Sequence, residues 1–353
     1  MTKTIQLKAL TGARGIAAWV VVFYHIRSSF TEYVPIEVAR VAAKGYLAVD
    51  LFFVLSGFVM WLSYSDKFND MGLRAVPSFI VRRFARIYPL HFFMMVVAII
   101  MALAAEFLGN SNRQYPFAEL PLHFFLVQNW GFTNSLQWND PAWSISTEFA
   151  CYLLLPFASL VLLRWRGTPL IWILLILAFS TILSYVFAES GAVGIGDNIP
   201  QLGLARCLAE FFCGVFTCLF WKSAKQAHQP QTVTIMISVV SITMLFGWYF
   251  GLVYEVFATP ITLSALIFVL AITSNNACNP LSNPLAVFLG NISYSTYLVH
   301  YLLWAIVKLF FVSDLTNISA LTVGIYVVLT FSASILLYHL IEVPARIFIQ
   351  RRL

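Results

Sequence analysis

Charge is what this sequence has least of. Only 10% of its 353 residues are charged, whereas 60% are hydrophobic. A soluble globular domain carries charge at about a quarter of its positions. So few charges cannot cover a water-facing surface, which leaves lipid as the outer solvent. The composition therefore predicts an integral membrane protein and excludes an ordinary soluble domain.

Cysteine spacing and clustered basic residues give no sign of a metal or of nucleic acid. None of the five cysteines has CxxC spacing, so we expect no metal site and no disulfide framework. The net charge of +6 is spread over short loops. It forms no basic stripe with interleaved aromatic residues, so we expect no nucleic-acid partner. The cysteines are Cys151, Cys207, Cys213, Cys218 and Cys278.

Long apolar runs, by contrast, fill the chain. A membrane-spanning helix needs about 20 apolar residues, and ten runs approach or exceed that length. The sequence therefore predicts an all-α bundle of about ten transmembrane helices that forms a single domain over residues 1–353. The runs fall at roughly 9–29, 45–64, 84–108, 146–163, 169–188, 201–221, 233–254, 258–274, 285–311 and 319–341.

The first run is expected to stay in the mature protein. It contains Arg14, and no small-residue cleavage site follows it, so it reads as a retained span and not as a signal peptide. Residues 115–145 mix short apolar stretches with proline, asparagine and three tryptophans. Their apolar part is too short to cross a membrane, so we expect an interfacial or re-entrant element there.

Basic residues predict the orientation of the bundle, because cytoplasmic loops are enriched in lysine and arginine. The loops on the amino-terminal side carry fourteen of them and the opposite loops carry four, which predicts that both termini are cytoplasmic. The first group is Lys3, Lys8, Lys67, Arg74, Arg82, Arg83, Arg86, Arg164, Arg166, Lys222, Lys225, Arg346, Arg351 and Arg352. The second is Arg27, Arg40, Lys44 and Arg113.

Ionisable residues inside the spans are candidates for function, because each costs several kcal/mol unless it meets a partner or a water-filled cavity. The first span contains Arg14 and His25. Their separation places them within about 20° of one helix face and about 16 Å apart along it. The structural alternative is that Arg14 reaches the inner headgroups and His25 bonds a neighbouring helix.

Three arginines open the third span. Arg82, Arg83 and Arg86 are spaced by three and four residues, so they share one helix surface. Guanidinium groups bind phosphates well, which makes these residues and Arg14 candidates for binding the phosphates of coenzyme A. An ordinary basic flank at the inner leaflet is the alternative.

Two acids begin spans on the side where His25 lies. A carboxylate near an imidazole can orient it and raise its basicity, so Asp50 and Glu148 are catalytic candidates together with His25. Helix capping is the alternative role for each acid. Ser56, inside the second span, is a substrate-binding candidate or a site of close helix packing.

The ninth span carries a polar stripe. Tyr297 and His300 are spaced by three residues, and we consider both as substrate-binding candidates, with a helix-facing polar stripe as the alternative. His339 and Glu342 are expected to organise the inner end of the last span.

These motifs, taken in order, resemble the acyltransferase-3 family of membrane acyltransferases along nearly the whole chain. Arg14 and His25 fit its Arg-x10-His pair, and Arg83 and Arg86 fit its Arg-x-x-Arg element. The second span resembles its GxxGVDxFFxxSGF signature, with Ala48 where a glycine is common. WSISTEF and GNISYSTYLVH are similar to two further motifs.

The resemblance implies transfer of an acyl group, often acetyl, to hydroxyls of a carbohydrate or glycolipid acceptor. It maps the family's essential histidine and arginines onto His25, Arg14, Arg83 and Arg86. The expected donor is a cytoplasmic acyl-CoA, with acetyl-CoA preferred, and the expected location is the plasma membrane of a bacterium. Some members carry an additional extracytoplasmic domain. This chain ends at Leu353 after its last predicted span, so none is expected here.

Other functions remain open on the residues alone. A transporter or flippase for a lipid-linked sugar or acyl compound also places histidine, arginine and glutamate inside its spans, although no inverted repeat is visible. A catalytically inactive membrane scaffold would use the same polar pairs for structure only.

Overall fold

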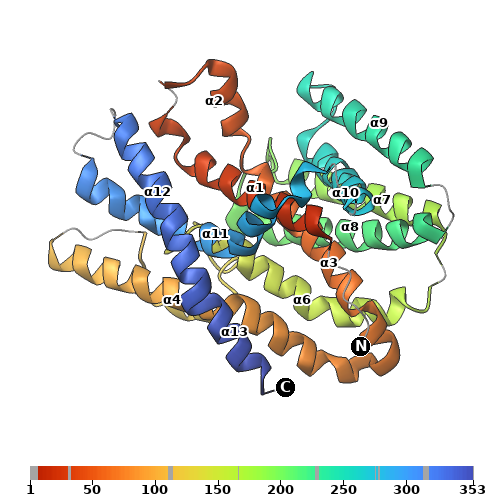
Figure 1. The fold of residues 1–353 in the computed structure, drawn as a ribbon, viewed down its shortest axis with the longest axis horizontal. Coiled ribbons are helices and arrows are strands. Elements are labelled where there is room, and N and C mark those ends of the chain that lie inside the picture. The colour runs from red at the N-terminus through yellow and green to blue at the C-terminus, as the bar shows by residue number, and fades with distance from the viewer. Residues whose placement is uncertain are drawn as a thin grey trace.

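The protein is a bundle of helices (Figure 1), seen here in a computed structural model. The structure describes residues 7–30, 33–109, 114–165, 167–226, 230–274, 276, 279–312 and 318–352. Within these ranges every regular element is helical, which confirms the predicted fold class. Five residues used in the predictions above lie outside the described ranges; they are Lys3, Arg113, Arg166, Cys278 and Leu353.

A long helix lies at each of the ten predicted positions. They are α1 (Lys8–His25), α3 (Leu47–Met71), α4 (Val76–Phe107), α6 (Ala142–Leu162), α7 (Pro169–Glu189), α8 (Ile199–Gln226), α9 (Pro230–Tyr249), α10 (Glu255–Thr273), α11 (Pro284–Phe311) and α12 (Ala320–Leu337). Shorter helices are α2 (Ile36–Ala43), α5 (Leu120–Phe124) and α13 (Val343–Gln350). Single turns are η1 (Arg27–Ser29), η3 (Gly72–Ala75), η4 (Phe117–Glu119), η5 (Pro280–Ser282) and η6 (Tyr338–Glu342).

Eight continuous helical segments of the described chain are long and apolar enough to cross a membrane. One of them, Leu47–Phe107, is 61 residues long and contains α3, η3 and α4. The helix α1, which carries Arg14 and His25, is not among the eight. The chain is thus a multi-pass membrane protein, whereas the count of ten crossings and the cytoplasmic termini stay predictions.

The core forms where the first and eleventh helices meet the third and eighth. The main packing partners are α1 with α11 and α3 with α8, and α8 also contacts α6, α7 and α10. By contrast, α9 packs mainly on α10 and lies at the edge of the bundle (Figure 1). Helices far apart in sequence therefore surround a common interior.

The segment between α4 and α6 folds back onto the bundle. It contains η4, α5 and a loop in which Trp138 is fully buried. The side-chain amide of Asn139 donates to the carbonyl of Leu298 in α11, at 3.0 Å. Helix α6 begins at Ala142, earlier than the predicted residue 146. The segment therefore brings Asp140 and Pro141 to the middle of α11.

Close contact between α3 and α8 depends on two glycines. A Cβ atom at Gly57 would lie 1.8 Å from the carbonyl oxygen of Phe211, and one at Gly214 would lie 1.9 Å from that of Val54. Backbone atoms cannot yield as a flexible side chain does. Small residues at such crossings are what allows membrane helices to approach closely.

We expect Gly57→Ala to destabilise the protein by about 1–3 kcal/mol, because the added methyl group must push α3 and α8 apart. Thermal unfolding of the purified protein in detergent measures the effect. Gly324→Ala in α12 is the matched control, since a Cβ atom there meets nothing within 4 Å. Equal melting temperatures for the two variants would contradict the close-packing argument.

Candidate active site

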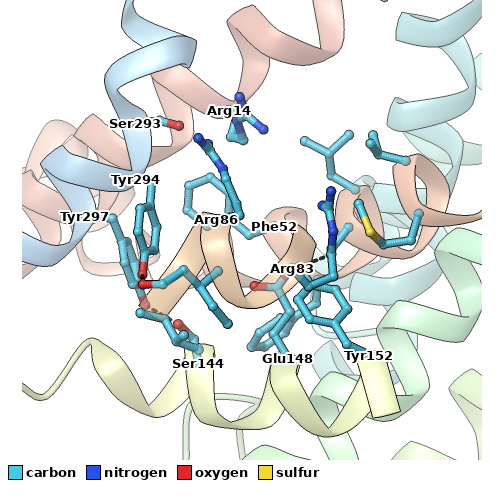
Figure 2. A pocket seen from close by; sticks show the side chains of 17 residues that line it. Arg14, Phe52, Arg83, Arg86, Ser144, Glu148, Tyr152, Ser293, Tyr294 and Tyr297 are labelled. Atoms are coloured by element: carbon cyan, nitrogen blue, oxygen red, sulfur yellow. Dashed lines mark hydrogen bonds between the residues drawn. The ribbon is translucent and has the colours of Figure 1, made fainter. Parts of the chain in front are cut away.

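A cavity of about 170 Å³ lies between α1, α3, α4, α6 and α11 (Figure 2). Its charged lining residues are Arg14, Arg83, Arg86 and Glu148. Ser56 and Tyr297 also line it, so the structure brings most of the predicted site residues to one place. We call this space the arginine cavity.

Arg86 is paired with an acid from the other end of the chain. Its guanidinium forms an ion pair with Glu342, which is fully buried. The hydroxyl of Ser295 donates to the second carboxylate oxygen of Glu342 at 2.9 Å. Glu342 lies in η6, a π-helical turn between α12 and α13, and such turns often occur at functional sites. Besides organising a helix end, Glu342 thus neutralises one cation of the cavity.

The other two guanidinium groups have only neutral partners. Arg14 Nη2 donates to the carbonyl of Gly290 at 3.0 Å. Arg83 Nη2 donates to the hydroxyl of Tyr64 at 3.0 Å, and the guanidinium lies 5.2 Å from the centre of that ring. In the described part of the chain, neither arginine has a carboxylate within ion-pair distance.

These unpaired cations make the cavity a site for anions. A buried charge without a counter-charge is costly, and an anion that enters the cavity would supply the missing partner. Arginine forms strong, charge-assisted hydrogen bonds with phosphate and carboxylate oxygens. Figure 2 shows the guanidinium ends of Arg14 and Arg86 near one another at one side of the cavity.

Glu148 belongs to the same cavity. Its carboxylate accepts a hydrogen bond from the hydroxyl of Tyr152 at 2.6 Å, and that hydroxyl lies 3.3 Å from Ser56 Oγ. Through these contacts Tyr152 links Glu148 of α6 to Ser56 of α3, and all three residues line the cavity. Glu148 is therefore placed near the arginines.

His25 lines a second cavity, of about 250 Å³, which we call the histidine cavity. Other members of its wall are Tyr46, Asp140, Arg206 and Tyr297. Asp140 comes from the loop before α6, where burial raises the pKa of its carboxyl group while hydrogen bonds from Tyr301 and Gln114 oppose that shift. The imidazole thus shares a polar enclosure with an acid and a guanidinium group.

A second imidazole orients His25. His25 Nδ1 lies 2.9 Å from the carbonyl oxygen of Val21 and 3.2 Å from His300 Nε2. His300 Nδ1 lies 2.7 Å from the carbonyl oxygen of Tyr297. Because a carbonyl oxygen can only accept, the hydrogen of each neutral ring is assigned to Nδ1. Nε2 of His25 is then the basic nitrogen, as a general base requires.

Tyr297 is the boundary between the two cavities, since it lines both. Its hydroxyl lies 2.8 Å from Ser144 Oγ and donates to the carbonyl of Pro141 at 3.1 Å. Ser144 lines the arginine cavity, whereas Pro141 lines the histidine cavity. The two spaces are therefore adjacent and share Tyr297 as a lining residue.

Asp50 is committed to a buried ion pair. Its oxygens accept from Nε and Nη2 of Arg206, at 2.5 and 2.7 Å, and both residues are almost completely buried. Glu210, one turn further along α8, interacts electrostatically with both. Asp50 lines neither cavity, but its partner Arg206 lines the histidine cavity.

The predicted acid–imidazole contact does not form. Neither Asp50 nor Glu148 has a hydrogen bond with His25 among the described residues, so the assistance expected of them stays a prediction. Arg82 does not line the arginine cavity, and its role as a donor-binding residue also remains untested.

Arg206 and Asp140 are not among the site residues predicted from the sequence. Arg206 lies inside the predicted span 201–221, so the argument applied to Arg14 would have identified it. Asp140 precedes the helix that starts at Ala142, and an aspartate in a loop carries no comparable signal. Only the fold shows that Asp140 lines the histidine cavity.

Comparison with known proteins gives a consistent set of relatives. A family model described as an acyltransferase domain matches residues 7–339. The acyltransferase MdmB of Streptomyces mycarofaciens is 28% identical over 324 residues, which cover 85% of this chain and 79% of that protein. The peptidoglycan O-acetyltransferase OatA of Listeria monocytogenes is 24% identical, over 96% of this chain.

The relatives differ in length from this chain. It spans 55% of the length of the Listeria monocytogenes protein and 58% of several Staphylococcus aureus relatives that are 22% identical to it. No solved structure gives a significant match.

We expect Arg206→Met to destabilise the fold by about 3–5 kcal/mol, because it leaves the buried Asp50 carboxylate without a partner. Adding Asp50→Leu should restore much of that stability, since the pair is then replaced by apolar side chains. Thermal unfolding of the wild type, both single variants and the double variant in detergent gives the coupling energy. Additive effects would show that the pair does not hold α3 and α8 together.

Proposed function

Because the chain belongs to the acyltransferase family whose model matches residues 7–339, it is an acyltransferase, and we propose that its donor is acyl-CoA, preferably acetyl-CoA. The proposed acceptor is a hydroxyl group of a carbohydrate or glycolipid, and the proposed location is a bacterial plasma membrane. The observation that carries the proposal is the pair of adjoining cavities, one rich in guanidinium groups and one containing an imidazole.

The arginine cavity suits the donor. Arg14 and Arg83 lack a counter-charge, and the phosphates of coenzyme A would supply one. A space of about 170 Å³ holds only part of such a molecule. We therefore place the phosphates there, against Arg14 and Arg83, with the adenosine outside the opening and the thioester carbonyl directed to Tyr297.

The histidine cavity suits the acceptor. Nε2 of His25 takes the proton of the acceptor hydroxyl while the hydroxyl oxygen attacks the carbonyl carbon of the thioester. The new carbon–oxygen bond replaces the carbon–sulfur bond, and the departing thiolate of coenzyme A receives the proton. The contact from His300 to Nδ1 keeps the imidazole oriented through both steps.

The boundary at Tyr297 protects the donor from hydrolysis. A donor that waits in a cavity of its own is shielded from water that fills the acceptor side. The ring and its contacts with Ser144 and Pro141 must move for the two substrates to meet. The OatA relative is named for transfer to peptidoglycan, a carbohydrate polymer, which supports a carbohydrate acceptor for this chain.

We expect His25→Ala to lower the rate of acyl transfer by about 100-fold to 10,000-fold, the usual contribution of a general base. The assay follows radiolabel from acetyl-CoA into an alkali-labile ester on candidate glycans. His339→Ala, which removes an exposed histidine, is the control. Unaltered turnover of folded His25→Ala would remove the base from this mechanism.

We expect Arg83→Met to weaken coenzyme A binding by about tenfold to a hundredfold, because a charge-assisted hydrogen bond contributes about 1.5–3 kcal/mol. Calorimetry on the purified protein measures the affinity. Arg74→Met is the control, because it removes an exposed arginine of η3 that does not line the cavity. Equal losses in the two variants would mean that the cavity is not where the donor phosphates bind.

A further inference from the structure

A third space opens on the side of the bundle. It is a groove of about 930 Å³ between α1, α2, α3, α9 and α10, close to the upper limit of typical ligand sites. Its wall is almost entirely apolar and includes Ile16 and Val20 of α1 and Leu266 of α10. We call it the lateral groove. It follows α1 from Ala13 to Val20, a length of about 10 Å.

Two cations stand at one end of this groove. Arg40 and Lys44 line it together with Trp248 and Tyr249. Arg40 is exposed, and among the described residues it has no hydrogen-bond or ion-pair partner. The cationic end is the end nearer His25, because Gly45, which follows Lys44, packs against Val20 and Tyr24 of α1. An apolar channel with cations and aromatic rings at one end fits an amphiphile with an anionic headgroup.

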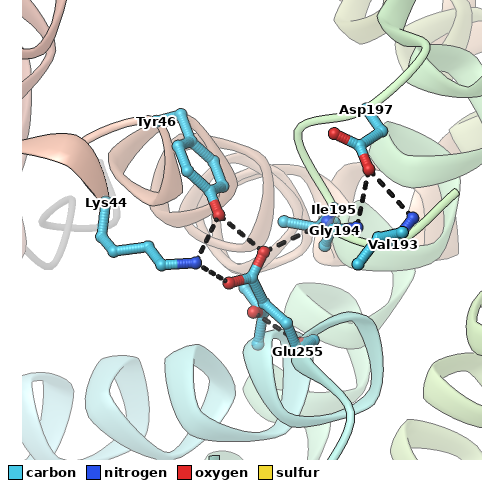
Figure 3. Close-up of polar contacts among 8 residues, drawn as sticks. Lys44, Tyr46, Val193, Gly194, Ile195, Asp197 and Glu255 are labelled. Carbon is cyan, nitrogen blue, oxygen red and sulfur yellow. Dashed lines mark hydrogen bonds and ion pairs between the residues drawn. The ribbon is translucent and has the colours of Figure 1, made fainter. Parts of the chain in front are cut away.

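A small set of polar contacts links the cationic end to the histidine cavity, and Figure 3 shows the residues that make them. Lys44 Nζ lies 2.6 Å from Glu255 Oε2 and donates to the hydroxyl of Tyr46 at 3.0 Å. That hydroxyl donates to Glu255 Oε1 at 2.7 Å. Lys44 lines the groove, whereas Tyr46 lines the histidine cavity. A headgroup that displaces these hydrogen bonds would pass from one space into the other.

We propose that the lateral groove holds the tail of the acceptor. The acceptor would then be an amphiphile with a single hydrocarbon chain, a phosphate bound by Arg40 and Lys44, and a sugar headgroup that reaches His25 past Tyr46. This inference rests on the proposed function and names the acceptor class. Bulk lipid would also fill an apolar groove, but bulk lipid alone does not account for a cationic end next to the histidine cavity.

Selectivity must come from the headgroup. A tail that enters the groove leaves lipid and not water, so it gains little hydrophobic free energy. The charge-assisted contacts of Arg40 and Lys44 with the phosphate favour the acceptor over lipids without a phosphate, and the sugar that reaches the histidine cavity distinguishes it from phospholipids. The groove then aligns the chain and directs the sugar toward the histidine cavity.

The test uses a photoreactive glycolipid and no acyl donor. The probe is the dodecyl ester of glucose 1-phosphate, carrying a diazirine either on the tail or on the sugar, with the full chain in phosphatidylcholine nanodiscs. Peptide mapping by mass spectrometry locates the labels. We expect the tail label in α1 and α10 and the sugar label in the segment from Leu136 to Pro141, which lines the histidine cavity.

Variants and a neutral probe test the role of charge. Arg40→Ala should lower labelling about tenfold, the effect of one charge-assisted hydrogen bond. Arg74→Ala is the matched control, because it removes an exposed arginine of η3 at the opposite end of α3. Dodecyl glucoside with the same diazirine, which lacks the phosphate, should label the groove weakly.

Three results would overturn the inference. They are equal labelling by the neutral probe, absence of the sugar label from the histidine cavity, and loss of labelling when equimolar phosphatidylglycerol is present. The last result would identify the groove as a site for ordinary anionic lipid. Labelling is measured without turnover, so it can succeed even if no acyl group is transferred. Conversely, transfer to tail-free sugars without labelling would keep the proposed function and reject the groove.

Discussion

The cost of burying charge inside a lipid-surrounded bundle governs this protein. Each cation in the interior needs a counter-charge, a hydrogen-bonding shell or access to a ligand. Arg206 has a counter-charge, since the Asp50 carboxylate accepts two of its hydrogen bonds. Arg86 has Glu342. Arg14 donates only to a carbonyl and Arg83 only to a hydroxyl, and both line the same cavity. The interior therefore separates cations that complete the fold from cations that await an anion.

Helix packing converts these charges into separate compartments. The close approach of α3 and α8 at Gly57 and Gly214 places Arg206 over Asp50, while the packing of α1 on α11 places His25 beside His300. Between the resulting cavities stands Tyr297, hydrogen-bonded to the beginning of α6. A transferase gains from such a partition, because an activated donor remains away from water until the acceptor is bound.

The two proposed substrates meet the bundle from different directions. The proposed donor cavity contains Arg83 and Arg86, which are predicted to lie on the cytoplasmic side, so a charged donor would enter there from water. The lateral groove opens between helices, where a lipid-borne molecule already concentrated in the membrane can diffuse in. A site that is reached from both water and lipid must be closed toward each of them until its substrate arrives. Toward the lateral groove, the contacts among Lys44, Tyr46 and Glu255 close the histidine cavity.

The sequence by itself determined the class of the protein, the positions of its helices and the identity of several cavity residues. Hydropathy and the cost of a charge in lipid are local properties, so a linear reading shows where helices run and that Arg14, Arg83 and Arg86 are unusual. It also favoured Asp50 and Glu148 as partners of His25, since all three were assigned to one side of the membrane.

Only the tertiary structure decided which groups meet. Asp50 pairs with Arg206, 156 positions away, and Arg86 with Glu342, 256 positions away. His25 contacts His300 across 275 positions. Each of these pairs depends on how far one helix is rotated and shifted against another, and that is set by the packing of all helices together. No local pattern contains this information, because a side chain one helical step away would face lipid or a different cavity.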